Sequence, residues 1–483
     1  MPANPYPSVD VCIVGYGPAG ATLANLLGQD RISTLVLERQ SAPYDLPRAV
    51  HFDAEAMRVF QTIGLADRIL PTTHVSPGML FVDRDGRLLV DWSRPMECTP
   101  QGWHMSYRFH QPDLEAILRE GVQRFPCVTV CARREFLDAV QDADGATVRA
   151  RNLETDAIET IRCRYLVGTD GANSKVRDAL IGTDWHDLHF LQDWLVVDIL
   201  LTRPVPALGD HSIQYCEPEA PATYVRGTGD RRRWEFALRP DESPEEAIRP
   251  ANVWARLARW VTPDDAVLER SATYTFRSVV NRHWREGRVF IAGDAAHLTP
   301  PFLGQGLCAG IRDVANLGWK LARVLRGQSS SDLLDTYASE RIPHVREYIA
   351  QAVRLGEVIT SCSLRHVVGG TPTGDGGLRI ESIAPPLGPG LARGWTGPAH
   401  RIAPQPVLSD GRRADDAAGY GYALFARPGL ALPQCNGVAV IADPAVRPWL
   451  DELGADAALV RPDRYVLGAA RCRAELDDLL TAV

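Results

Sequence analysis

The stretch of the chain that most constrains its fold runs from residue 9 to residue 38. Residues 9–14, VDVCIV, are mostly apolar and rich in valine and isoleucine, which is typical of a short buried strand. The turn GYGPAG at residues 15–20 follows at once, and ATLANLL at 21–27 continues as a helix would. Residues 34–38, TLVLE, predict a second strand that ends in an acidic residue. This order predicts a Rossmann-like βαβ unit.

Each glycine of the turn has its own physical task. Gly15 permits the tight turn, Gly17 lets the backbone approach a pyrophosphate, and Gly20 lets helix and strand pack closely. The start of the helix offers free N–H groups and the positive end of its dipole to phosphates. Glu38 lies 18 residues after Gly20, where a carboxylate can accept hydrogen bonds from ribose hydroxyls. The unit therefore predicts dinucleotide binding, and by itself it leaves FAD and NAD open.

Composition narrows the class of protein further. The 483 residues include 52 basic and 60 acidic side chains, a net charge of −8, with 45% hydrophobic and 23% charged residues. This balance is typical of a folded globular chain of two or three domains, and it excludes disorder as the main state. The pI of about 5.9 and the lack of a dense basic tract argue against a nucleic-acid partner.

The cysteines and the N-terminal region bear on metal sites and on location. The ten cysteines form no C-x-x-C pair, and the nearest two, Cys127 and Cys131, have no companion ligand pair, so we expect no metal site. Residues 11–28 are mostly apolar, but four glycines and a proline interrupt them, so we expect neither a membrane span nor a membrane partner. Residues 1–10 lack the basic start of a secretory signal, and reduced thiols suit a cytoplasmic protein, which is the location we expect.

Two later stretches distinguish between the two dinucleotides. Residues 165–177 predict a strand, a turn and a helix start, and they contain the pattern D-G-x-x-S-x-x-R beginning at Asp170. Residues 288–297 predict a strand that runs into an acidic turn at Gly293-Asp294. Together with the first glycine turn, these stretches resemble the three fingerprints of the class A, single-component FAD-dependent aromatic hydroxylases, and they occur in the family's order.

Further stretches resemble one branch of that family, which contains the 3-(3-hydroxyphenyl)propionate hydroxylases. They are residues 47–53, 60–61, 233–236, 304–313 and 337–341. The likeness covers most of residues 8–360. It implies an FAD that is bound noncovalently, because no His or Cys stands at an evident flavin-linking position.

The resemblance also implies which residues hold FAD. Asp294 would accept hydrogen bonds from the ribityl hydroxyls, and Asp170 would stand near the pyrophosphate. Backbone N–H groups at the start of the helix after residue 304 would face the pyrimidine edge of the flavin, where a helix N-terminus stabilises negative charge. The full expected set is Gly15, Gly17, Pro18, Ala19, Gly20, Glu38, Arg39, Arg48, Gln111, Asp170, Asp294, Pro301, Gly304, Gly306 and Leu307.

We expect an α/β fold of three parts: a Rossmann-like FAD-binding domain, an inserted antiparallel-sheet substrate domain and a C-terminal thioredoxin-like domain. The FAD domain takes residues 1–78, 101–183 and 276–360; the substrate domain takes 79–100 and 184–275. Residues 363–400, rich in Gly, Pro and Thr, predict a linker arm. Residues 401–483 resemble the thioredoxin-like tail of the branch without its C-x-x-C, so we expect packing or dimerisation there and no redox work.

The expected substrate sheet offers polar candidates for substrate contacts, because a sheet can present alternate side chains to a buried ring. They are Gln214, Tyr215, Tyr224, Arg226 and Glu235. A general base would help the reaction that the resemblance implies, since a phenolate is a stronger carbon nucleophile than a phenol. His51, just after Arg48, is the nearest titratable candidate for that base.

The resemblance implies that NAD(P)H reduces FAD, that reduced FAD captures O2 as a flavin hydroperoxide, and that a phenolic ring attacks it. We therefore predict an FAD-dependent NAD(P)H aromatic monooxygenase acting on a phenolic acid similar to 3-(3-hydroxyphenyl)propionate. Three alternatives stay open: a polycyclic natural product as substrate, an FAD oxidase or dehydrogenase without oxygen insertion, and a flavoprotein that only binds. The sequence also leaves open the exact phenol and ring position, NADH or NADPH, and a monomer or a homodimer.

Overall fold

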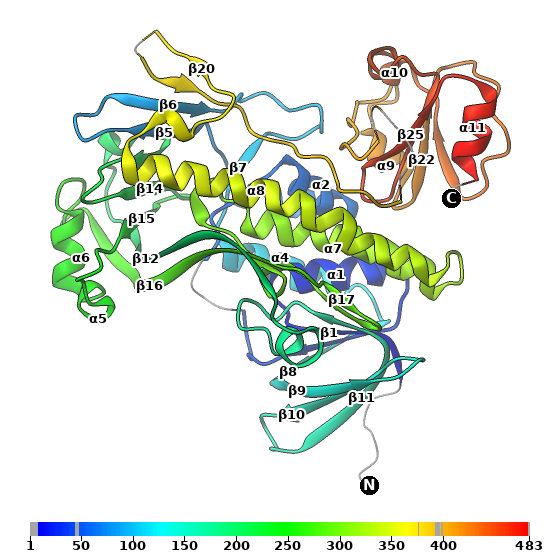
Figure 1. Ribbon diagram of the computed structural model, residues 1–483, viewed down its shortest axis with the longest axis horizontal. Coiled ribbons are helices and arrows are strands. Elements are labelled where there is room, and N and C mark those ends of the chain that lie inside the picture. The colour runs from blue at the N-terminus through cyan, green and yellow to red at the C-terminus, as the bar shows by residue number, and fades with distance from the viewer. Residues whose placement is uncertain (1–7, 44–47, 375, 392–396, 398, 482–483) are drawn as a thin grey trace.

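The computed structural model describes residues 8–43, 48–374, 376–391, 397 and 399–481. In Figure 1 a sheet with parallel strands lies at the bottom, a larger sheet at the left, and a C-terminal lobe at the upper right. The long helix α8 (Thr336–Ser361) runs across the middle between them. The fold therefore combines α-helices with β-strands, as the predicted α/β fold class requires.

The first sheet places the glycine turn at the carboxyl ends of its parallel strands. Its order is β17-β18-β11-β1-β2-β8, and β9 and β10 extend it as an antiparallel meander from β11. The central strand β1 is parallel to both neighbours, and apart from Asp10 its residues are buried. The bounds are β1 Val9–Val14, β2 Thr34–Glu38, β8 Val128–Ala132, β9 Arg134–Gln141, β10 Ala146–Asn152, β11 Ile158–Gly168, β17 Arg285–Glu286 and β18 Val289–Ile291.

Helices cover this sheet. Helix α1 (Pro18–Gln29) packs against α4 (Gln111–Val122) and α7 (Gly306–Leu325). Residues 308–322 of α7 are all buried, which places this helix in the core. The other helices are α2 Ala54–Thr62, α3 Ala66–Ile69, α5 Pro244–Ala247, α6 Pro250–Leu257, α9 Ala414–Ala418, α10 Arg447–Leu453 and α11 Arg473–Leu480. In the described ranges no helix is both long and apolar enough to cross a membrane.

A ten-stranded sheet forms the other side of the site. Its order is β19-β16-β12-β15-β14-β13-β5-β6-β21-β20, and its neighbours are antiparallel except for the parallel pairs β13–β5 and β21–β6. The bounds are β5 Gly78–Val82, β6 Leu88–Ser93, β12 Trp185–Leu201, β13 Ser212–Tyr215, β14 Ala222–Arg226, β15 Arg231–Ala237, β16 Ala266–Asn281, β19 His297–Leu298, β20 Thr371–Pro372 and β21 Leu378–Arg379. A small third sheet joins β3 His51–Asp53 and β4 His74–Val75 to β7 Ser106–Arg108.

The segment predicted as a linker arm, residues 363–400, takes a direct part in this sheet. Its strands β20 and β21 extend the sheet beyond β6, at the top of Figure 1. The ion pair between Arg379 and Asp91, 2.7 Å, fixes that edge. Composition rich in Gly and Pro predicts irregular chain, and the pairing with β6 was not visible in it because it depends on residues nearly 300 positions earlier.

The C-terminal lobe has a four-stranded mixed sheet in the order β23-β22-β24-β25. The bounds are β22 Tyr422–Ala426, β23 Val438–Ile441, β24 Ala457–Val460 and β25 Val466–Ala470. Buried ion pairs join the lobe to the rest: Arg58 of α2 binds Asp415 at 2.5 Å, and Arg461 binds Glu340 of α8 at 2.8 Å. The lobe is therefore held by charges as well as by apolar packing.

Candidate FAD and substrate site

A cavity of about 370 Å³ takes its walls from both large sheets. Ten of the fifteen residues expected to hold FAD line it: Gly17, Pro18, Ala19, Arg48, Gln111, Asp294, Pro301, Gly304, Gly306 and Leu307. They come from the first glycine turn, the segment before β3, the start of α4, the acidic turn after β18 and the segment that leads into α7, which lie far apart in the sequence. Over the described residues, no group of three His, Cys, Asp or Glu side chains gathers as metal ligands.

The other five residues lie outside the walls of this cavity. Gly15 has φ +100°, and a Cβ there would come within 2.5 Å of the Thr169 carbonyl oxygen, while a Cβ on Gly20 would overlap the Gly15 carbonyl. These two glycines therefore shape the turn and the packing behind it. The remaining three contact their own surroundings: Glu38 accepts a 2.8 Å hydrogen bond from the Tyr16 N–H, Asp170 accepts one of 2.5 Å from Ser174, and Arg39 is exposed.

Two helix N-termini face the cavity without a side-chain cap. The N-cap residues, Gly17 for α1 and Gln305 for α7, accept no N–H of the first turn with a side chain. A Cβ on Gly17 or Gly306 would meet no atom within 4 Å, so both backbones border open space. Free N–H groups beside open space suit a pyrophosphate at α1 and the polar edge of a flavin at α7.

Asp294 supplies a carboxylate to the same cavity. Its oxygens accept no hydrogen bond from any described residue, and it is exposed to the cavity. The cavity itself lies within the protein, and the resulting loss of solvation raises the pKa of Asp294, while the charges of His297 and Arg48 oppose that shift. A carboxylate with no protein donor is available to the hydroxyl groups of a ribityl chain. The residues present therefore fit FAD.

Behind Asp294, a buried carboxylate that sequence reasoning missed holds the acidic turn. Asp313 accepts hydrogen bonds from the Gly293 N–H at 3.0 Å, from His297 at 2.8 Å and from Arg341 at 2.9 Å. Those partners come from three different elements. An acidic residue in the middle of a buried helix is the signal that would have found it.

Gln111 positions the Arg48 segment at the cavity wall. Its side-chain oxygen accepts hydrogen bonds from the N–H groups of Arg48, 2.9 Å, and Ala49, 2.7 Å, and its Nε2 donates to Glu115 at 2.8 Å. The Arg48 carbonyl oxygen in turn accepts a hydrogen bond of 2.6 Å from the side chain of Arg233 in β15. The amide of Gln111 thus acts on the backbone that borders the cavity.

Strand alternation decides which predicted substrate residues reach the cavity. Gln214 and Glu235 line it, and cross-strand pairing puts Thr223 between them on the same face. Tyr215 and Tyr224, one position along, contact Trp260 and Trp234 in a separate apolar cluster. The expectation that Tyr215, Tyr224 and Arg226 face the substrate does not agree with this cavity, because none of the three lines it. Neighbouring positions of a strand face opposite sides of the sheet.

Arg226 has its own partners away from the cavity. Its guanidinium donates to the Gly229 carbonyl at 3.0 Å and lies 3.3 Å from Asp210.

Within the cavity, the side-chain oxygen of Gln214 accepts a hydrogen bond of 2.5 Å from the Thr223 hydroxyl. Burial raises the pKa of Glu235, and the nearby charge of Arg233, 3.9 Å away, opposes that shift.

His51 is a neutral imidazole whose two nitrogens are both engaged. Nδ1 lies 3.1 Å from the Gly304 carbonyl oxygen, which can only accept, so Nδ1 carries the proton. Nε2 lies 3.1 Å from Arg94, which can only donate, so Nε2 accepts. Burial, followed by the charges of Arg94 and Arg108, lowers the pKa of His51 to about 3. Sequence reasoning missed both arginines, because nothing distinguished them among so many.

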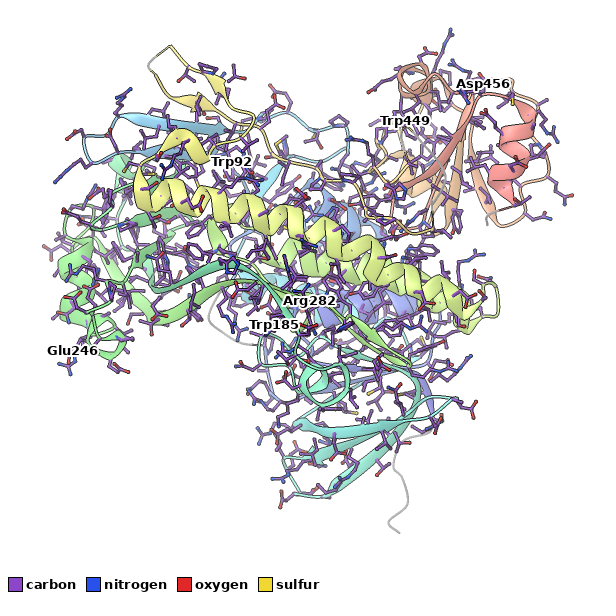
Figure 2. All side chains as sticks on the ribbon, viewed as in Figure 1. Trp92, Trp185, Glu246, Arg282, Trp449 and Asp456 are labelled. Carbon is purple, nitrogen blue, oxygen red and sulfur yellow. The ribbon has the colours of Figure 1, made fainter. Side chains whose placement is uncertain are left out.

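A second cavity, of about 650 Å³, adjoins the first. Trp92, Arg94 and Leu303 line both, so these side chains form the partition. Its far wall includes Trp449 of the C-terminal lobe. Figure 2 labels these two tryptophans, Trp92 beside the large sheet and Trp449 on the C-terminal lobe, and both line the second cavity.

Comparison with known proteins agrees with this geometry. A family model described as "FAD binding domain" matches residues 8–352. A protein of Rhodococcus jostii (strain RHA1) named "Probable NADH-specific resorcinol 4-hydroxylase" is 44% identical over 357 residues, 73% of this chain and 66% of that protein. A 3-(3-hydroxy-phenyl)propionate/3-hydroxycinnamic acid hydroxylase of Mycobacterium sp. (strain JLS) is 39% identical over 382 residues, 78% of this chain and 64% of the relative. The chain thus spans just under two thirds of the length of these relatives.

Solved structures share the whole fold. The flavin-dependent monooxygenase PieE, in complex with FAD and substrate, superimposes with a TM-score of 0.80 over 99% of this chain and 98% of that one, at 22% identity. Aklavinone-11 hydroxylase, with FAD and aklavinone, gives a TM-score of 0.76 over 98% of each chain, at 23% identity. The glycine turns, the open helix N-termini, Asp294 and the family match lead to one conclusion: the chain belongs to the FAD-binding domain family of flavoproteins, and its cofactor is FAD.

Proposed function

We propose that the protein is an FAD-dependent monooxygenase that uses NAD(P)H and O2 to hydroxylate a phenolic small molecule. The observation that carries this proposal is one cavity in which the wall proposed for FAD is continuous with a wall that combines apolar side chains, Met79, Trp92 and Phe276, with polar and charged ones. Such a wall suits an aromatic ring held beside the flavin. The names of the relatives support a phenolic substrate, and one of them supports NADH as the first reductant to test.

When bound, FAD supplies the redox and oxygen chemistry. The protein supplies orientation, exclusion of water and local charge. The first turn of α7 borders the cavity with its free N–H groups, which would stabilise negative charge on a bound flavin ring. Gln111 and Arg233 hold the Arg48 backbone at the wall.

We keep His51 as the proposed base for the phenol proton. Its neutral imidazole has one lone pair, on Nε2, and Arg94 donates to that nitrogen. Proton transfer to Nε2 therefore requires Arg94 to turn to another acceptor, which an anionic substrate group would provide. It also requires the pKa of His51 to rise from about 3, and neutralising the charge of Arg94 would act in that direction. General-base assistance of this kind contributes about a hundredfold to ten-thousandfold in rate.

The test is oxygen transfer itself. The holoenzyme is supplied with NADH or NADPH, 18O2 and a set of phenolic acids, simple phenols and polycyclic phenols. We expect substrate-stimulated reductant oxidation and one 18O atom in a hydroxylated product. Reductant oxidation that yields only hydrogen peroxide with every phenol would make the protein an oxidase, and FAD binding without stimulated oxidation would make it a binding protein.

His51→Gln tests the base without removing the hydrogen bonds. A glutamine amide can donate to the Gly304 carbonyl and accept from Arg94, but it cannot take a proton at neutral pH. We expect flavin reduction near the parent rate and a lower product yield with more peroxide, with the deficit shrinking as pH approaches the phenol's own pKa. Equal product yield at every pH would return His51 to a structural role.

A further inference from the structure

A cluster of three nitrogen side chains lies in the substrate part of the cavity. His51 and Arg108 are directly opposite each other in the β3–β7 pair, so their side chains share a face of that sheet. Arg94 comes from the chain just after β6 and donates to His51 Nε2 at 3.1 Å. All three line the cavity. The hydrogen bond from His51 to Gly304 places the cluster beside the start of α7.

The two arginines of this cluster have no carboxylate of their own. Among the described residues, no Asp or Glu oxygen lies within 4.0 Å of either guanidinium. Arg108 donates to the Ser212 hydroxyl at 2.7 Å, and Arg94 lies over the Trp92 ring, 4.5 Å from its centroid. The Nε atoms of both arginines are buried and have no partner.

The acids whose charges act on the two arginines are engaged elsewhere. Asp53, which acts on Arg94, pairs with Arg312. Asp210 pairs with His74 at 3.0 Å and with Arg226 at 3.3 Å. Glu235 lies 3.9 Å from Arg233. Asp210 and Glu235 influence Arg108 only from a distance. This differs from Arg233 itself, which shares the cavity wall and binds Asp198 at 2.7 Å.

The protein shows the electrostatic consequence of this arrangement. Burial, with the charge of Arg94 in second place, lowers the pKa of Arg108 to about 9, and burial lowers the pKa of Arg94 to about 10. Arg108 is only 5% exposed. A buried guanidinium without a counter-ion costs free energy, and a bound anion would offset that cost.

We propose that Arg94 and Arg108 bind the carboxylate of an aromatic substrate, so that the enzyme takes phenolic acids in preference to neutral phenols. This rests on the proposed function and specifies its substrate class. Guanidinium groups suit a planar carboxylate because they can donate two parallel hydrogen bonds. We do not assign the phosphates of FAD to these two arginines. The glycine turn at residues 15–20 already offers the phosphates the uncapped start of α1 and the open backbone at Gly17. A carboxylate drawn to Arg94 would also free Nε2 of His51.

The test compares an acid with its neutral isostere. Binding of 3-(3-hydroxyphenyl)propionate and of 3-(3-hydroxyphenyl)propanamide to the oxidised holoenzyme is titrated by the change in the flavin spectrum. The parent should bind the acid at least about tenfold more tightly than the amide. Arg108→Gln and Arg94→Gln should each weaken acid binding by about tenfold to a hundredfold, the scale of charge-assisted hydrogen bonds, and change amide binding little.

Two further variants make the comparison specific. Arg108→Lys should recover part of the lost acid binding, because it restores the charge without the bidentate fork. Arg203→Gln is the matched control: its side chain is exposed and paired with Asp265 on the surface, so both ligands should bind as to the parent. FAD content is measured for every variant.

Three results would overturn the inference: equal affinity of the parent for acid and amide, equal loss of both ligands in the arginine variants, or loss of FAD in place of acid binding. The first needs no variant, so a misfolded variant does not protect the proposal. Hydroxylation of acid and amide alike, without dependence on the arginines, would refute this inference and leave the proposed function standing. If the acid binds in a way that depends on the arginines but no phenol is hydroxylated, the proposed function is refuted and the carboxylate site stands.

Discussion

Glutamine in place of Glu340 would show how far buried charges hold the C-terminal lobe to α8. Glu340 accepts two 2.8 Å hydrogen bonds from Arg461 and one of 2.7 Å from Lys320, and all three side chains are fully buried. Removing one partner of a buried ion network costs about 3–5 kcal/mol, because the other charges lose their counter-ion. Arg461 keeps Asp463, and burial already lowers the pKa of Lys320 to about 8. We therefore expect the lower end, about 3 kcal/mol.

The assay is urea unfolding of the holoenzyme, followed by circular dichroism and by flavin fluorescence. Limited proteolysis adds a local readout, since the lobe should become accessible first if Glu340 holds it. Glu475→Gln is the control: Glu475 pairs with Arg471 at 2.8 Å on the lobe surface. A solvent-exposed ion pair contributes little to stability, so this variant should unfold almost as the parent does.

The pH dependence supplies a second check with a definite sign. Burial raises the pKa of Glu340, but the charges of Arg461 and Lys320 outweigh it and hold that pKa well below its ordinary value of 4.5. A lowered carboxyl pKa stabilises the fold above pH 4.5, and the contribution is lost as the pH falls further. The difference in stability between parent and variant should be full at pH 7 and should shrink as the pH falls below 4.5. A gap under about 1 kcal/mol at pH 7, or one that does not change with pH, would refute the reasoning.

Three further predictions concern FAD. The purified protein should be yellow and should release its flavin on acid precipitation; flavin retained in the pellet would contradict noncovalent binding. Asp294→Ala should weaken FAD binding about tenfold to a hundredfold in a titration of the apoprotein, the loss expected for charge-assisted hydrogen bonds, and unchanged affinity in a folded variant would remove Asp294 from the site. Gly304→Ala should lower both thermal stability and FAD affinity, because φ is +63° and a Cβ would lie 2.8 Å from His51 Nδ1. Gly86→Ala, with φ +80° and no atom within 4 Å of a Cβ, is the matched control, and an equal effect there would show that backbone strain alone is responsible.

Local patterns in the sequence were enough to predict much of this molecule. The strand, glycine turn and helix at residues 9–29 need only short-range information, since backbone conformation at Gly15 and the apolar run of β1 decide them. The glycine turn and the acidic turn in the wall proposed for FAD are local motifs, whereas Arg48 and Gln111 were expected there only from the resemblance to the family.

The tertiary structure decided what no local pattern contains. Tyr215 and Gln214 are equally plausible in the sequence, but the pairing of β13 with β14 sends only Gln214 to the cavity, since a shift of one residue reverses the face of a strand. Arg94 and Arg108 become partners of His51 only when β6 and β7 are brought beside β3. Burial then turns ordinary arginines into charges that need an anion, because the energy of a charge depends on the solvent it has lost and the groups around it. Composition and spacing along the chain show neither how far a side chain is buried nor which groups surround it.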